Sequence, residues 1–194
     1  MSPLEELRHS CSHVLATAVL RLFPETQLDI GPPTDNGFYY DIDFKEHAIS
    51  EKDFAAIEKR ALEIAREKHE FKMRSVSKAD ALDFYKTQDN PFKVELIENL
   101  TDGDITFCDH SDFTDLCRGG HLPNTGFIKA FKLLSIAGAY WRGDSKNKML
   151  QRIYGTCWKT KKDLEEYLHR IEEAEKRDHR ILGKQLDLFH FQEE

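Results

Sequence analysis

The stretch LEELRHSCSHVLATAVLRLF, residues 4–23, sets the pattern from which the rest of the chain can be interpreted. Its apolar residues recur at the spacing of one helix face, and Pro3 and Pro24 mark the two ends of the predicted helix. His9 and His13 stand one helical turn apart, nearly opposite the apolar stripe. The two imidazoles can therefore contact the same ligand or the same neighbouring residue, although a solvated helix face would explain them equally well.

A second cluster, Asp115-Leu-Cys-Arg-Gly-Gly-His121, decides between these interpretations. Its glycines allow a tight turn that brings Cys117 and His121 to one side. The two motifs together supply the ligand types and number of a tetrahedral zinc site. They equally suit a site that activates water, with histidines as general base and acid and Asp115 fixing a tautomer. A cysteine nucleophile is the weaker alternative, because no helix N-terminus is predicted beside Cys117 to stabilise a thiolate.

Composition points to an ordinary globular chain. Its 194 residues are 40% hydrophobic, which fits one or two domains with a core. No apolar run is long enough to cross a bilayer and no secretory leader is recognisable, so we expect a cytoplasmic protein without a membrane partner. The four cysteines show no disulfide pattern, and free thiols are expected.

Charge is distributed unevenly along the chain. The net charge of −7 argues against a nucleic-acid partner, but residues 118–162 carry ten Lys or Arg and a single acid. Apolar and aromatic residues lie between these cations, which favours a surface for a polyanion over a merely solvated face. The side chains expected to contact it are Lys129, Lys132, Arg142, Lys146, Lys148 and Arg152.

The remaining pattern predicts an α+β fold, in which a mixed or antiparallel sheet packs with helices. Strands are predicted at residues 28–30, 37–41, 71–76 and 105–108, and a hairpin at 127–140 and 149–158. Further helices are predicted at residues 50–69, 77–85 and 160–188, whereas residues 92–97 could be helix or strand. Residues 1–158 are expected to form one domain, and 159–194 a long C-terminal linker helix.

Further motifs follow one another in order: Ile30-Gly-Pro32, Asn36-Gly-Phe-Tyr-Tyr-Asp41, Phe131-Lys-Leu133, Gly138-Ala-Tyr-Trp-Arg-Gly-Asp144, Met149-Leu-Gln-Arg-Ile-Tyr-Gly155, Arg177-Asp-His179 and Gly183-Lys-Gln-Leu-Asp187. With the two clusters, they resemble the editing region of bacterial threonyl-tRNA synthetases, from Leu4 to Glu194. The resemblance implies a second additional domain followed by a linker helix. The chain would be either part of a longer synthetase, with class II catalytic and anticodon-binding domains and a homodimeric assembly, or a free-standing editing protein.

The resemblance implies hydrolysis of tRNA(Thr) mischarged with serine, with a histidine orienting or deprotonating the water. The residues implied as catalytic are His9, His13, Asp115, Cys117 and His121. Those implied in substrate binding are Tyr40, Lys93, Arg118, Gly119 and Gly120, and the cations named above would contact the tRNA. No cofactor or tightly bound metal is expected.

Two alternatives stay open. The related alanyl-type editing domains hold zinc with the same pattern, which would place zinc at His9, His13, Cys117 and His121 in a zinc-dependent aminoacyl-ester hydrolase. The other alternative is a catalytically silent tRNA-binding module.

Overall fold

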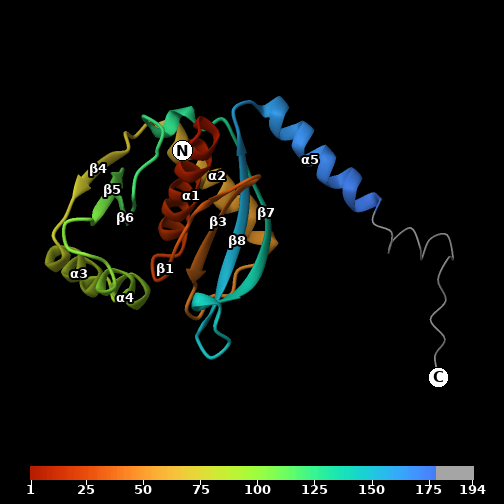
Figure 1. The fold of residues 1–194 in the computed structure, drawn as a ribbon. Helices are drawn as coiled ribbons and strands as arrows, with labels where there is room; N and C mark the ends of the chain where they lie inside the picture. Colours follow the sequence, from red (N-terminus) through yellow and green to blue (C-terminus); the bar gives the residue numbers. More distant parts are fainter. Residues whose placement is uncertain (178–194) are drawn as a thin grey trace, which may run out of the picture.

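The computed structural model describes residues 1–177, in which helix α1 (Pro3–Leu22) lies between two antiparallel sheets (Figure 1). A capping box formed by Ser2 and Glu5, with Pro3 in the first turn, starts this helix. The predicted helix is confirmed, but the alternative of a solvated face around His9 and His13 is wrong. Between Leu7 and Val19 every residue except His9 is buried. Small residues such as Ser10, Ser12 and Ala16 allow the second layer to approach the face opposite the apolar stripe.

The first sheet has the strand order β1 (Gln27–Leu28), β3 (Gly37–Asp43), β8 (Met149–Trp158) and β7 (Ala130–Tyr140), with β2 (Pro33–Thr34) paired to β3. The predicted β7–β8 hairpin is confirmed. Phe38, Tyr40 and Ile42 alternate along β3 and enter the same core as α1, whereas Tyr39 and Asp41 occupy the opposite face. One face of β3 therefore packs toward α1, and its other face points to the opposite side of the sheet.

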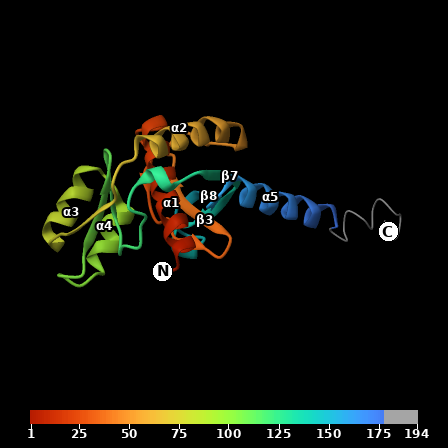
Figure 2. The same ribbon diagram turned by 90° about the horizontal axis from the view of Figure 1, so that it is seen from above.

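Helix α2 (Phe54–Glu67) packs against α1 and the same core. A short 3-10 turn, Glu51–Asp53, precedes it and is capped by Ser50, as the sequence predicted. Seen from above, α2 lies near the far end of α1 and runs across its direction (Figure 2).

The second sheet is smaller and consists of β4 (Lys72–Ser75), β5 (Thr106–His110) and β6 (Phe113–Leu116). Helices α3 (Lys78–Thr87) and α4 (Pro91–Glu98) accompany it and share a second hydrophobic core with it. Strand β6 was not predicted. The ambiguous stretch at 92–97 is helical, because Pro91 and the side chain of Asn90 cap its first turn. Strand β6 ends directly before Cys117, and α4 contributes Lys93 to the site.

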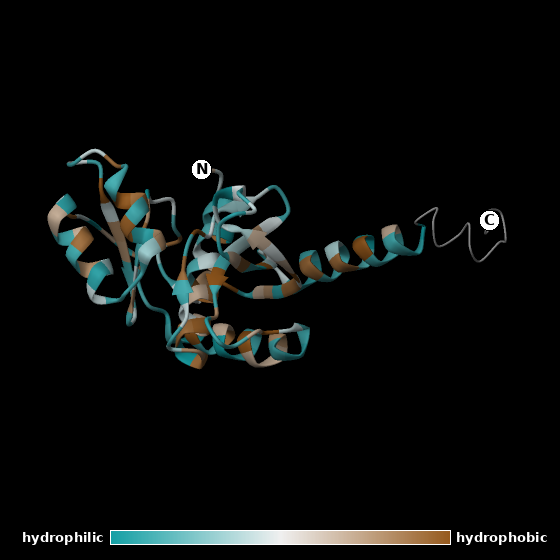
Figure 3. Ribbon diagram, turned by 90° about the horizontal axis from the view of Figure 1, so that it is seen from below, coloured by the Kyte–Doolittle hydropathy of each residue, from teal (hydrophilic) through white to brown (hydrophobic). Residues whose placement is uncertain are grey.

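Helix α5 (Lys161–Lys176) leaves the end of β8 and extends away from both sheets (Figures 1 and 3). Its start, capped by Thr160, agrees with the prediction, and Tyr167 contacts Trp158 with ring centroids 4.9 Å apart. None of its residues is buried. The predicted continuation of this helix to Leu188, the motif at 183–187 and the remainder of the predicted linker lie outside the described residues. Among residues 1–177, no helix is long and apolar enough to cross a membrane.

Candidate active site

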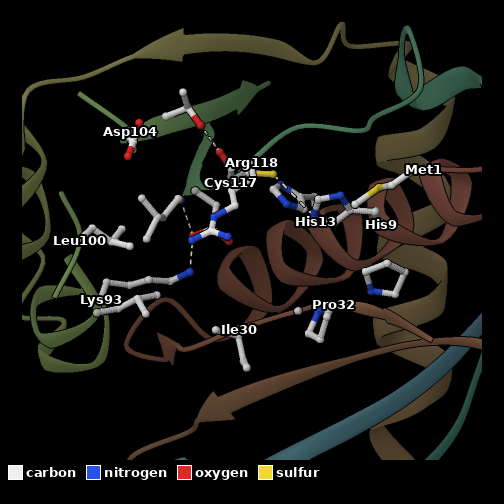
Figure 4. Close-up of a pocket in the computed structure, with 16 residues that line it drawn as sticks. Met1, His9, His13, Ile30, Pro32, Lys93, Leu100, Asp104, Cys117 and Arg118 are labelled. Atoms are coloured by element: carbon white, nitrogen blue, oxygen red, sulfur yellow. Dashed lines mark hydrogen bonds and ion pairs between the residues drawn. The ribbon is translucent and has the colours of Figure 1, made fainter. Parts of the chain in front are cut away.

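The two sequence motifs meet in space between the two sheets (Figure 4). One nitrogen or sulfur atom from each of His9, His13, Cys117 and His121 lies within 4.8 Å of the other three. The Cys117 Sγ atom is 3.0 Å from His121 Nε2 and 3.5 Å from His9 Nε2. Residues far apart in the chain therefore form one compact cluster, hereafter the His/Cys cluster.

The glycine turn after Cys117 fixes the orientation of His9. Gly119 and Gly120 have φ values of 94° and 81°, which L side chains rarely adopt. The turn brings the carbonyl oxygen of Gly120 to 3.3 Å from His9 Nδ1. A carbonyl can only accept a hydrogen bond, so Nδ1 carries the proton and Nε2 keeps a free lone pair. This nitrogen faces Cys117 and is suited to accept a proton.

His121 is held by neighbours that the sequence did not identify. Its ring lies between His9, at a centroid distance of 4.3 Å, and Phe71, at 5.0 Å, with both pairs stacked. Its Nδ1 atom is 3.4 Å from the hydroxyl of Ser10, which also accepts the N–H of Leu122. These contacts leave Nε2 directed at Cys117.

Burial keeps the cluster uncharged near neutral pH. Desolvation lowers the pKa of His121 to about 3 and that of His13 well below its usual value, and it also lowers the pKa of His9. The same effect raises the pKa of Cys117 to about 11. The metal-free site therefore offers neutral imidazoles and a neutral thiol, which argues against a cysteine nucleophile.

Asp115 sits beside the cluster in a separate polar network. Its carboxylate receives the hydroxyls of Tyr40 and Tyr85 at 2.5 Å and 3.1 Å, and the N–H of Leu116 at 2.8 Å. The Lys93 ammonium group lies 2.5 Å from the same carboxylate. Among residues 1–177, Asp115 makes no hydrogen bond to a histidine. The predicted tautomer-fixing role therefore passes to the Gly120 carbonyl, because the Asp115 oxygens are engaged by other donors.

Three members of the His/Cys cluster, His9, His13 and Cys117, line one pocket of about 460 Å³ together with the Asp115–Lys93 pair (Figure 4). Ile30, Gly31 and Pro32 form another part of its wall, and Arg118 lies at the pocket as well. A side chain at Gly31 would collide with the ring of Tyr40, so glycine is required there. The predicted substrate-binding residues Tyr40 and Lys93 thus connect to the site through Asp115.

Most of the predicted tRNA-contacting cations in the basic segment, residues 118–162, are already paired with acidic side chains of the same fold. Four of the six predicted tRNA-contacting cations pair with acids from other elements: Lys132 with Glu58, Arg142 with Glu95, Lys148 with Asp43 and Arg152 with Asp41. Lys129 and Lys146 are exposed and form no ion pair within the described part of the chain. Much of the positive charge therefore compensates the acidic remainder of the fold.

Lowering the pH from 7 to 5 is expected to destabilise the fold through its buried histidines. Burial lowers the pKa of His110 to about 4, below its value in the unfolded chain. The unfolded state therefore binds more protons in this range, and the free energy of unfolding falls as the pH drops below about 6.5. His110→Phe should reduce this loss by about 1–2 kcal/mol, measured by urea unfolding at the two pH values. An unchanged pH dependence would contradict the explanation.

Comparison with known proteins gives a matching family model and similar relatives. The family model described as "Threonyl and Alanyl tRNA synthetase second additional domain" matches residues 105–154, which contain Asp115, Cys117 and His121. The threonine–tRNA ligase of Flavobacterium psychrophilum is 62% identical over 183 residues, 94% of this chain and 28% of that protein. The threonine–tRNA ligase of Francisella philomiragia is 59% identical over 192 residues, 98% of this chain and 30% of that protein.

The chain thus spans less than a third of the length of these relatives. The second additional domain accounts for only part of the match, because identity extends over residues well outside 105–154. The resemblance carried by the motifs is confirmed: over nearly its whole length, the chain is similar to a region of the threonine–tRNA ligases that contains the second additional domain.

Proposed function

We propose that this domain hydrolyses the ester that joins serine to wrongly charged tRNA(Thr). The observation that carries the proposal is that His9 and Cys117 meet in the wall of one pocket, with His121 in contact with Cys117 and the buried Asp115–Lys93 pair beside them. Serine and threonine differ by one methyl group, which a binding pocket discriminates by only about 1–3 kcal/mol. A threonine–tRNA ligase therefore benefits from a second, hydrolytic site, and the similarity to such ligases supports this assignment.

In the proposed reaction, the free lone pair of His9 Nε2 orients a water molecule and accepts its proton. The oxygen of that water attacks the carbonyl carbon of the seryl ester, and backbone N–H groups of the glycine turn stabilise the oxyanion. The bond to the ribose oxygen then breaks, and this oxygen takes up the proton that His9 Nε2 accepted from the water. Packing around Cys117 would leave too little room for the additional methyl group of threonine.

A deacylation assay with Ser-tRNA(Thr) and Thr-tRNA(Thr) tests the proposal. We expect release of serine to be at least about tenfold faster than release of threonine, in line with the discrimination possible for one methyl group. Equal rates would contradict the proposal. Intact Ser-tRNA(Thr) despite measurable binding would favour the catalytically silent binding module.

A zinc-dependent hydrolase is the second candidate, since the donor set fits this ion. The Nε2 atoms of His9 and His121 both face Cys117 Sγ, while their Nδ1 atoms contact Gly120 and Ser10, a pattern typical of zinc-binding histidines. The buried His13 Nδ1 has no hydrogen-bond partner in the described part of the chain. Zinc bound by His9, His13, Cys117 and His121 would supply a Lewis acid for ester hydrolysis.

We propose the metal-free route and expect purified protein to contain well under one zinc per chain. Treatment with a chelator should leave the rate of Ser-tRNA(Thr) hydrolysis unchanged. Elemental analysis and the deacylation assay check both expectations on the same sample. One zinc per chain, together with loss of activity after chelation and recovery on adding zinc, would instead establish the second candidate.

In a longer parent chain, the domain would act beside synthetase catalytic and anticodon-binding domains, in a homodimer and in the cytoplasm. The greater length of the relatives supports such a parent. Helix α5 fits a connection to it, because it leaves the domain without burying any of its residues.

A further inference from the structure

A second, smaller pocket adjoins the site pocket. It has a volume of about 240 Å³, and Ile30 and Leu96 line both pockets. Its remaining wall combines aromatic and charged side chains from the loop after β1, from β3, α4 and β8, and from the end of β7 with the loop that follows it. Among the lining residues are Asp29, Phe92, Trp141 and Arg142. A ligand that reaches the His/Cys cluster could therefore place a neighbouring group in this second pocket.

Asp29 gives this pocket a hydrogen-bond acceptor without a donor. The residue is only 8% exposed, and its backbone N–H pairs with the carbonyl of Asp41. The neighbouring Asp41 carboxylate is engaged by Arg152 at 2.6 Å and 2.7 Å. The Asp29 carboxylate, in contrast, has no hydrogen bond or ion pair within residues 1–177. Burying an acid in this way is costly, which points to a donor supplied by a ligand.

Aromatic side chains give the same pocket a flat apolar part. Trp141 is half-buried, and its ring meets that of the buried Phe92 at a centroid distance of 5.3 Å. The Arg142 guanidinium carbon lies 5.2 Å from the centre of the Trp141 ring, while its charge pairs with Glu95 at 2.9 Å. Aromatic rings held in this way are suited to stack against a planar ligand.

We propose that this pocket binds an unstacked nucleobase with an exocyclic amino group, namely the cytosine next to the terminal adenosine of the tRNA. This inference rests on the proposed function, because it assumes that the 3′ end of a tRNA enters the site pocket. An aspartate accepts a hydrogen bond from the cytosine amino group, and an aromatic side chain stacks on the base. Cytidine directly precedes the terminal adenosine in all tRNAs, and the two pockets share Ile30 and Leu96, so an adenosine at the site pocket would bring this base next to the second pocket.

Comparing two small substrates distinguishes the contribution of this pocket from that of the reacting centre. Seryl-adenosine carries only the terminal nucleoside, whereas the seryl ester of the trinucleotide CpCpA also carries the cytidines. We expect the wild-type protein to hydrolyse the trinucleotide ester with a lower KM. Asp29→Ala and Trp141→Ala should each raise that KM about 5- to 150-fold, the range for one base contact, and leave seryl-adenosine hydrolysis unchanged. Glu46→Ala, which removes an exposed acid elsewhere, is the matched control and should change neither.

Base identity provides a sharper test. In the UpUpA ester an acceptor replaces the amino group, so the wild-type protein should prefer the CpCpA ester. Asp29→Asn supplies a donor and should reduce or reverse this preference. Equal effects of Asp29→Ala on the trinucleotide and on seryl-adenosine would overturn the proposal, and so would equal KM values for the C and U esters in the wild-type protein.

Failure of the proposed function itself gives a different result from failure of the cytosine pocket. If the wild-type protein hydrolyses neither substrate, binding of the dinucleotides CpA and UpA still tests whether the second pocket binds a cytosine, independently of any hydrolysis. The readout is the NMR signal of the Trp141 indole N–H. A shift that is larger with CpA and lost in Asp29→Ala supports the pocket, and no shift with either dinucleotide overturns it.

Discussion

Replacing His9 with alanine is expected to lower the rate of Ser-tRNA(Thr) hydrolysis by about 100- to 10,000-fold. The Gly120 carbonyl holds the proton on His9 Nδ1 and leaves Nε2 free to accept one from water. Alanine removes this base, and no other histidine of the cluster has its Nδ1 held by a backbone carbonyl. Single-turnover deacylation measures the chemical step directly, so the loss should appear in the rate constant rather than in tRNA binding.

His121→Ala is expected to abolish hydrolysis as well, because its ring packs on His9 and its Nε2 contacts Cys117. His47 offers a matched control, since it is exposed and remote in sequence from both motifs. His47→Ala should keep wild-type activity. Circular dichroism and urea unfolding should show that all three variants remain folded at neutral pH. Full activity in both His9→Ala and His121→Ala would refute the assignment of the site.

The His/Cys cluster could be predicted because its members carry two separable signals. His9 and His13 are spaced by one helical turn, and the glycines before His121 predict a turn that returns to Cys117. Each signal is local, so the sequence reveals it directly. That the two motifs meet is a tertiary fact, for which the order of the other motifs and their resemblance to a known family provided the only guide.

The supports of the site were less predictable. Tyr85 reaches Asp115 from α3, and Phe71 stacks on His121 from the segment before β4. In neither pair does the sequence spacing of the two residues predict that they are in contact. The burial of α1 on both faces was missed for a related reason. Helical periodicity reports the strongest apolar stripe, whereas the opposite face is covered through small residues such as Ser12 and Ala16.

The net charge of a sequence segment was also a poor guide to which cations are available to a ligand. The excess of Lys and Arg in residues 118–162 suggested a surface open to a polyanion. The β8 residue Arg152 instead makes two hydrogen bonds to Asp41 on the neighbouring strand and lies over the ring of Tyr39. Segment charge says nothing about pairing across strands, because cross-strand neighbours come from distant parts of the chain.

Lys93→Ala is expected to lower the free energy of unfolding by about 3–5 kcal/mol, measured by urea denaturation at pH 7. The side chains of Lys93 and Asp115 are only 3% and 6% exposed, and their charged atoms lie 2.5 Å apart. Removing the ammonium group leaves a carboxylate buried without its counter-ion. The matched control is Arg60→Ala, because the Arg60–Glu63 pair is 39% and 38% exposed and should contribute less than about 1 kcal/mol.

The double variant Lys93→Met with Asp115→Asn distinguishes an unpaired charge from lost packing. It removes both charges, while Asn keeps one acceptor oxygen, which can still accept the hydroxyl of either Tyr40 or Tyr85. Most of the stability lost in Lys93→Ala should return, because the cost comes from the uncompensated carboxylate rather than from a lost attraction. If stability returns but hydrolysis does not, the charged Lys93–Asp115 pair contributes to the reaction itself. A loss below about 1 kcal/mol in Lys93→Ala would mean that the tyrosines and the Leu116 N–H suffice to hold the charge.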